Sequence, residues 1–262
     1  MSIDSILTIA LVGGELTVLA LLAYRRIWRT LPIFSLYMIW SLATDLMGLY
    51  FQVSHATNQT SFVFFAAQSI IDAILLFAVL VELSWSVLRP VRTSLPKKTV
   101  LFLGILIAIA GLIVWPFAGI NIEHLTAQAK LFMHLNQTMV LLRIVCFLIM
   151  AGFSQLLSIG WRDRELQIAT GFGVYSIVSM IVSILDSHQS DVNKIHTYHL
   201  AITISYLGTL AYWVLSFAAK EYERKEFSPQ MQQLLVYMGG AARAGSIALS
   251  EIPPDRSRKR DK

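Results

Sequence analysis

Seven long apolar runs divide this sequence, and they constrain its fold more than any other feature. They cover about residues 5–24, 32–53, 61–88, 99–118, 131–158, 167–186 and 198–219, with charged or polar segments between them. A helix needs about 20 residues to cross the hydrocarbon core of a bilayer. Unpaired backbone groups are too costly in hydrocarbon for any irregular span, and the runs are too long for barrel strands. The pattern therefore predicts an all-α fold, a polytopic membrane protein built as a bundle of seven transmembrane helices.

The composition agrees with this class, because 56% of the 262 residues are hydrophobic and only 14% are charged. A soluble domain usually carries about 25% charged residues. Seven spans with short loops fill residues 1–220 and leave no room for a large soluble domain. The single cysteine, Cys146, excludes an internal disulfide and any multi-cysteine metal site.

The placement of basic residues predicts the orientation of the helices. Lys and Arg gather after the first, third and fifth runs, and nine of the chain's 21 lie from Lys220 onward, whereas the other three loops hold only Lys130 and Lys194. Because cytoplasmic loops are enriched in Lys and Arg, we expect the N-terminus outside and the C-terminus in the cytoplasm. Residues 221–262 are then a short basic cytoplasmic tail, expected to be partly an amphipathic helix and then disordered. Its charge suits an anionic lipid surface, and it is too short for a nucleic-acid domain.

Four ionisable residues lie near the middle of the predicted helices: Glu15, Asp45, Asp72 and Arg143. At about 1.5 Å per residue, all four fall close to the bilayer midplane. A lone charge there costs roughly 2.5–3.5 kcal/mol, so we expect them to face one another, with Arg143 paired to one or two carboxylates. At least one carboxyl would then be protonated or hold a cation. Such a cluster fits a structural clasp as well as a ligand, proton or ion site.

Polar residues at helical spacing extend this cluster along single helix faces. The predicted ligand, ion or proton site comprises Glu15, Asp45, Gln68, Asp72, Asn136, Arg143, Tyr175, Thr203 and Tyr206. The run from Leu101 to Pro116 is apolar all round, so we expect the fourth helix at the periphery, facing lipid. The tryptophans near helix ends are interpreted as interfacial anchors; they are Trp28, Trp40, Trp85, Trp115, Trp161 and Trp213.

The histidines suggest a second, less specific site at the outer face. All six lie on the predicted outer side or at the outer end of a helix. Zinc and copper prefer imidazole and carboxylate ligands, and a candidate metal site comprises Asp186, His188, His196 and His199. No other cofactor is expected. A retinal group would need a lysine inside the last helix, where the sequence has only Lys220 at the end.

One internal pattern favours a repeated architecture. Phe34-x-x-Tyr37-x-x-x-Ser41 in the second run recurs as Phe172-x-x-Tyr175-x-x-x-Ser179 in the sixth. These runs would be equivalent in two parallel three-helix repeats joined by a linker helix, as in small sugar transporters of the SWEET and PQ-loop type. The Pro-Gln motif of those transporters is absent, and the sequence assigns no family.

Three functions fit these features. The first is a non-enzymatic receptor-like, sensory or accessory protein that binds a small ligand in an outward-facing polar cavity and acts through a cytoplasmic or membrane signalling partner. The second is a proton- or cation-coupled transporter of a small solute, which would use the midplane carboxylates and Arg143. The third is a metal-dependent membrane hydrolase at the outer face. An oligomer is compatible with each, and the short loops are typical of a bacterial inner-membrane protein.

Overall fold

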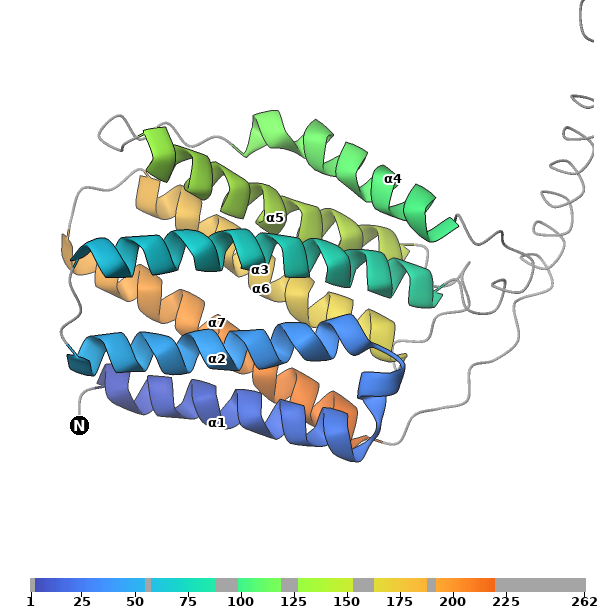
Figure 1. Ribbon diagram of the computed structural model, residues 1–262, viewed down its shortest axis with the longest axis horizontal. Coiled ribbons are helices and arrows are strands. Elements are labelled where there is room, and N and C mark those ends of the chain that lie inside the picture. Colours follow the sequence, from blue (N-terminus) through green and yellow to red (C-terminus); the bar gives the residue numbers. More distant parts are fainter. Residues whose placement is uncertain are drawn as a thin grey trace, which may run out of the picture.

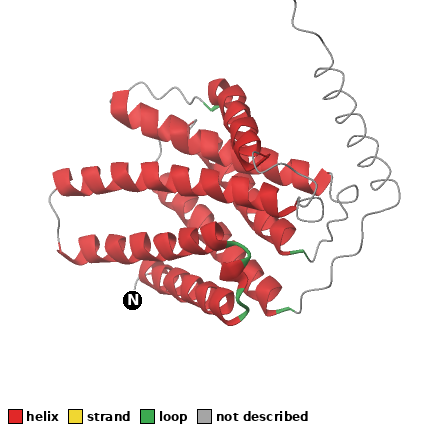
Figure 2. Cartoon of the chain, turned by 45° about the vertical axis from the view of Figure 1, so that its right-hand side comes forward, coloured by secondary structure: helices red, strands yellow, loops and turns green. Residues whose placement is uncertain are grey.

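The computed structural model describes residues 3–54, 58–87, 99–118, 127–152, 163–187 and 192–219. Regular structure in these residues is entirely helical, which confirms the all-α class (Figure 2). The α-helices are α1 (Ile3–Tyr24), α2 (Pro32–Ser54), α3 (Asn58–Val87), α4 (Thr99–Val114), α5 (Ala127–Gly152), α6 (Arg164–Ser187) and α7 (Val192–Ala218). Two short 3₁₀ turns, η1 (Ile27–Arg29) and η3 (Trp115–Phe117), follow α1 and α4.

Each of the seven α-helices in the described residues is long and apolar enough to cross a membrane. This confirms the predicted number of helices long and apolar enough to span a membrane, as in an integral membrane protein. Helices α3 and α7 begin before the apolar runs do, at Asn58 and Val192, because backbone hydrogen bonding carries a helix on into polar flanking residues. The predicted end of the fifth span at residue 158 and the whole tail 221–262 lie outside the described residues.

Six helices form a closed ring in the order α1, α2, α3, α5, α6 and α7, and α7 packs back against α1 (Figure 1). Helix α4 lies outside the ring, at the upper edge of Figure 1, where it packs on α3 and α5. No residue of α4 is buried, which confirms its predicted peripheral position. The ring leaves an interior that all six of its helices can line.

One end of the ring interior is filled by aromatic side chains. We call the end of the bundle with the α1–α2 connection the turn end, and the end at which α1 begins the N-terminal end (Figure 1). Toward the turn end, the edge of Phe34 meets the ring of Trp213 at a centroid distance of 5.3 Å, and Phe172 meets the same indole at 5.0 Å. Phe217 completes this aromatic cluster, and all four side chains are buried. Trp213 is therefore a core residue, and its interpretation as an interfacial anchor is wrong.

Two glycines of α6 allow its neighbours to pack closely. A Cβ atom at Gly171 would overlap the Trp213 indole of α7, and one at Gly173 would overlap the Phe147 ring of α5. Small residues are a usual means of bringing membrane helices together, since hydrocarbon gives no hydrophobic drive for association. The aromatic cluster thus depends on the absence of a side chain at Gly171, and the packing of α5 on α6 depends on its absence at Gly173.

At the turn end, side chains from distant parts of the chain form hydrogen bonds with the backbone groups of two helix termini. Helix α2 begins at Pro32, and the preceding Leu31 offers no side-chain acceptor for the first backbone N–H groups. Glu82 of α3 accepts them instead, from Ile33 at 2.9 Å and from Phe34 at 2.8 Å. Where α7 closes the ring against α1, the Arg25 side chain donates a hydrogen bond of 2.6 Å to the carbonyl oxygen of Ala218, the last residue of α7. These contacts hold α2 against α3 and α1 against α7.

Candidate functional site

Glu15 lies in the middle of α1, and its side chain is fully buried. Its Oε1 atom accepts hydrogen bonds from the Ser41 hydroxyl of α2 at 2.6 Å and from the Tyr206 hydroxyl of α7 at 2.7 Å. The two hydroxyls lie 3.1 Å from each other. The other carboxyl oxygen, Oε2, is buried and has no hydrogen-bond partner among the described residues. Three helices therefore meet at a single carboxyl oxygen.

Asp72 is held by side chains on two helices. The Trp40 indole of α2 donates to Asp72 Oδ1 at 2.7 Å, and Gln68, one turn earlier on α3, also hydrogen-bonds this carboxyl group. The structure thus corrects the interpretation of Trp40 as an interfacial anchor. This contact could not be predicted, because a tryptophan and an aspartate on different helices have no sequence spacing that relates them.

Asp45 lies on α2 one turn beyond Ser41. Unlike Glu15 and Asp72, it makes no hydrogen bond or ion pair within the described part of the chain. The carboxyl group lies instead at the wall of a cavity. Of the three carboxylates, it is the one that accepts no hydrogen bond from the described residues.

Arg143 of α5 is 5% exposed, and its contacts differ from the expected ones. Its Nε atom donates to the carbonyl of Met139 at 3.4 Å, one turn earlier in the same helix. Its guanidinium lies 5.5 Å from the ring centroid of Tyr175 on α6, a cation–π distance. The expected ion pairs with Glu15, Asp45 or Asp72 do not form among the described residues. Met139 and Tyr175 hold the side chain on the α5–α6 wall, away from the carboxylates of α1, α2 and α3.

A cavity of about 300 Å³ lies in the middle of the ring, between these groups. Every ring helix contributes to its wall, and α4 does not. Of the predicted site residues, its wall includes Asp45, Asp72, Asn136, Arg143, Tyr175, Thr203 and Tyr206. The other two, Glu15 and Gln68, stand behind the wall, where each hydrogen-bonds a residue that lines the cavity. The structure therefore gathers the predicted residues around one space.

Sequence reasoning left out several residues of this site. Tyr37 and Ser41 line the cavity, and Trp40 orients Asp72. Tyr37 and Ser41 stand on the same face of α2 as Asp45, at positions i, i+4 and i+8, so their spacing was a usable signal. The aromatic cluster lies between this cavity and the turn end of the bundle, because Phe34 and Phe172 each precede the cavity tyrosine of their helix by one turn.

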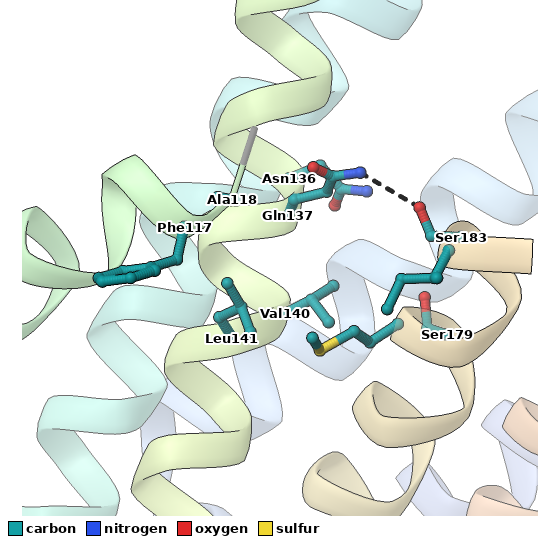
Figure 3. A pocket seen from close by; sticks show the side chains of 10 residues that line it. Phe117, Ala118, Asn136, Gln137, Val140, Leu141, Ser179 and Ser183 are labelled. Atoms are coloured by element: carbon teal, nitrogen blue, oxygen red, sulfur yellow. Dashed lines mark hydrogen bonds between the residues drawn. The ribbon is translucent and has the colours of Figure 1, made fainter. Parts of the chain in front are cut away.

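A second, smaller cavity of about 180 Å³ lies between α5, α6 and the end of η3 (Figure 3). Its walls are mostly apolar, and Gln137 of α5 donates to the Ser183 hydroxyl of α6 at 3.1 Å across it. Asn136 borders both cavities. The hydrogen bond between Gln137 and Ser183 ties α5 to α6 across the space.

The predicted metal site is not described at the level needed to test it. His188 lies outside the described residues, as do the side chains of Asp186, His196 and His199. Among the side chains that the structure describes, no group of three or more His, Cys, Asp or Glu residues could hold a metal ion. One further histidine has a structural contact: His134 Nε2 lies 2.8 Å from the carbonyl oxygen of Trp115 and ties α5 to η3.

Comparison with known proteins adds no assignment. No protein-family model, no curated protein and no solved structure matches this chain. What can be said of its function follows from the residues of the cavity.

Proposed function

We propose that this protein is a receptor-like or accessory membrane protein that binds a small polar ligand in the central cavity and acts through a partner. The observation that carries the proposal is the cavity wall, which takes ionisable or hydroxyl side chains from α2, α3, α5 and α7 at mid-helix. Polar groups at that depth in a membrane are costly and are retained mainly for ligand, ion or proton sites. A purely structural clasp would bring Arg143 and the carboxylates into contact, whereas here a space separates them.

The ligand enters, in this proposal, from the N-terminal end of the bundle. The aromatic cluster fills the ring toward the turn end, and basic residues follow α1 at that end, in the η1 region. Under the positive-inside rule the turn end is cytoplasmic and the cavity opens outward. A bacterial inner membrane is the proposed location, and the basic tail is the proposed contact with the cytoplasmic partner.

A transporter is the second candidate, and the symmetry of the ring favours it. Two successive triplets, α1–α3 and α5–α7, close through α3 against α5 and α7 against α1, with α4 as an outer linker. Phe34 and Phe172, which begin the repeated sequence pattern, meet in the aromatic cluster with their ring centroids 6.1 Å apart. Paired repeats around a midplane site are the usual basis of alternating access.

Cysteine labelling from each side of the membrane tests these proposals. Cys146 is the chain's single cysteine, so a Cys146→Ala background allows one new cysteine at a time. Ile202 lines the cavity, and Ile204 on the same helix is 52% exposed on the outer surface of the bundle. We expect Ile202→Cys to react with a membrane-impermeant thiol reagent from the N-terminal side only, and Ile204→Cys to stay unreactive.

Two other labelling results would contradict this expectation. Reaction of Ile202→Cys from both sides would replace the receptor-like function with transport. Equal lack of reaction at both positions would show that water does not reach the cavity, and would contradict ligand binding there.

A further inference from the structure

The cavity wall carries charge of both signs that the protein itself does not neutralise. Arg143 makes no ion pair within the described residues, and its hydrogen bond to Met139 uses only Nε. Asp45 makes neither an ion pair nor a hydrogen bond there. Both side chains line the same cavity. A buried charge without a partner is strongly unfavourable, so a ligand that carries the opposite charges would be stabilised in this cavity.

The other two carboxyl groups each accept hydrogen bonds from neighbouring side chains. Asp72 accepts from Trp40 and is bonded by Gln68, and Glu15 accepts from Ser41 and Tyr206 behind the wall. Within the described residues, Asp45 on α2 and Arg143 on α5 are therefore the wall charges that no other side chain hydrogen-bonds or ion-pairs, and they offer one binding site for a cation and one for an anion.

The volume of the cavity and its aromatic wall residues limit the size and the side chain of the ligand. A volume of about 300 Å³ is at the lower end of small-molecule pockets, which suits a molecule of amino-acid size. Tyr37, Tyr175 and Tyr206 line the same space. Their rings offer apolar contact for a short side chain, and their faces favour a neighbouring cation.

We propose that the central cavity binds a small zwitterion of amino-acid size, with its carboxylate at the Arg143 guanidinium and its ammonium group at the Asp45 carboxylate. This inference rests on the proposed ligand-binding function and adds the chemical class of the ligand. A guanidinium forms paired hydrogen bonds with a carboxylate, which gives the site a preferred orientation for the ligand.

Thermal unfolding of the purified full chain in detergent tests the proposal with defined probes. A pool of neutral L-amino acids is compared with two matched pools, their methyl esters, which keep only the positive charge, and their N-acetyl derivatives, which keep only the negative one. We expect the amino-acid pool to raise Tm and neither derivative pool to do so. The active amino acid, identified by dividing the pool, should bind roughly 10- to 100-fold more weakly to Arg143→Gln and to Asp45→Asn.

Arg29→Gln, an exposed arginine at the turn end, is the matched control and should bind normally. Equal stabilisation by the methyl esters would reduce the site to a cation site, and equal stabilisation by the acetylated pool would reduce it to an anion site; either result overturns the proposal. No shift with any pool also overturns it. If Ile202→Cys is nevertheless labelled from the N-terminal side, the cavity stands and only the ligand class is wrong.

Discussion

Tyr206 and Ser41 decide whether the buried carboxyl group of Glu15 is tolerated in the middle of a membrane helix. Both donate to the same oxygen, and they come from α7 and α2. An unsatisfied buried acceptor costs about 1–3 kcal/mol, more than an ordinary hydrogen bond contributes. At the residue scale, the cavity therefore depends on the hydroxyl groups that bond Glu15 as much as on the charges at its wall.

Tyr206→Phe should lower the free energy of unfolding by about 1–3 kcal/mol, because it removes a donor and leaves the ring in place. Tyr175→Phe is the matched control, since the described contacts of Tyr175 are made by its ring, to Tyr206 and Arg143. Unfolding in mixed micelles measures both. In a Glu15→Leu background the cost of Tyr206→Phe should largely disappear; an unchanged cost there would show that the hydroxyl acts on something other than Glu15.

The sequence predicted which polar residues gather, but not how they bond. Mid-helix position alone picked out Glu15, Asp45, Asp72 and Arg143, because any charge at that depth must turn inward. The partners depend on which helices are neighbours and on their rotation, which sequence spacing does not encode. For this reason the contact of Trp40 with Asp72 was missed, and the expected ion pairs of Arg143 do not occur in the described residues.

At the element scale, the start of α2 is fixed by a side chain from another helix. Glu82 uses one oxygen for Ile33 and the other for Phe34, and its negative charge stands at the positive end of the helix dipole. Helix α2 carries Tyr37, Ser41 and Asp45 into the cavity. The register of α2 against α3, and with it part of the cavity wall, is therefore linked to Glu82.

Glu82→Gln should destabilise the protein by about 1–2 kcal/mol, since an amide has one acceptor oxygen and no charge. Glu82→Ala should cost more, because it removes both acceptors. Thermal unfolding of the parent chain and the two variants in one detergent gives their order of stability. Equal stability of Glu82→Gln and the parent chain would mean that the two backbone N–H groups find other acceptors.

The α6 glycines make a sharper prediction about helix packing. Gly171→Ala and Gly173→Ala should each cost about 1–3 kcal/mol, because the added methyl group meets an aromatic ring of a neighbouring helix. Gly208→Ala on α7 has no atom within 4 Å of its new Cβ, and it should be neutral or stabilising by about 0.5–1 kcal/mol. The free energy of unfolding, measured by chemical or thermal denaturation, distinguishes the two α6 variants from the α7 variant. Similar changes at all three positions would contradict the close packing of α6.

At the scale of the whole molecule, the ring of six helices is what creates an interior. The number of spans and the outer position of α4 were predictable, because both follow from apolar length and from the lack of a polar face. Ring closure was not, since nothing in the sequence states that the first helix meets the last. Closure places Glu15 of α1 within reach of Tyr206 of α7, and without it the cavity would be open to lipid.

A disulfide across α1 and α7 measures this closure directly. A Cβ atom at Gly14 would lie 3.4 Å from Cβ of Leu210, close to the separation of about 3.5–4.5 Å in disulfides. In the Cys146→Ala background, mild oxidation of Gly14→Cys with Leu210→Cys should cross-link most molecules, as counted by loss of free thiols in mass spectrometry. Gly13→Cys with Leu210→Cys should stay reduced, because no atom lies within 4 Å of a Cβ at Gly13. Failure of the first pair to cross-link, or equal cross-linking of both pairs, would contradict a closed ring around the cavity.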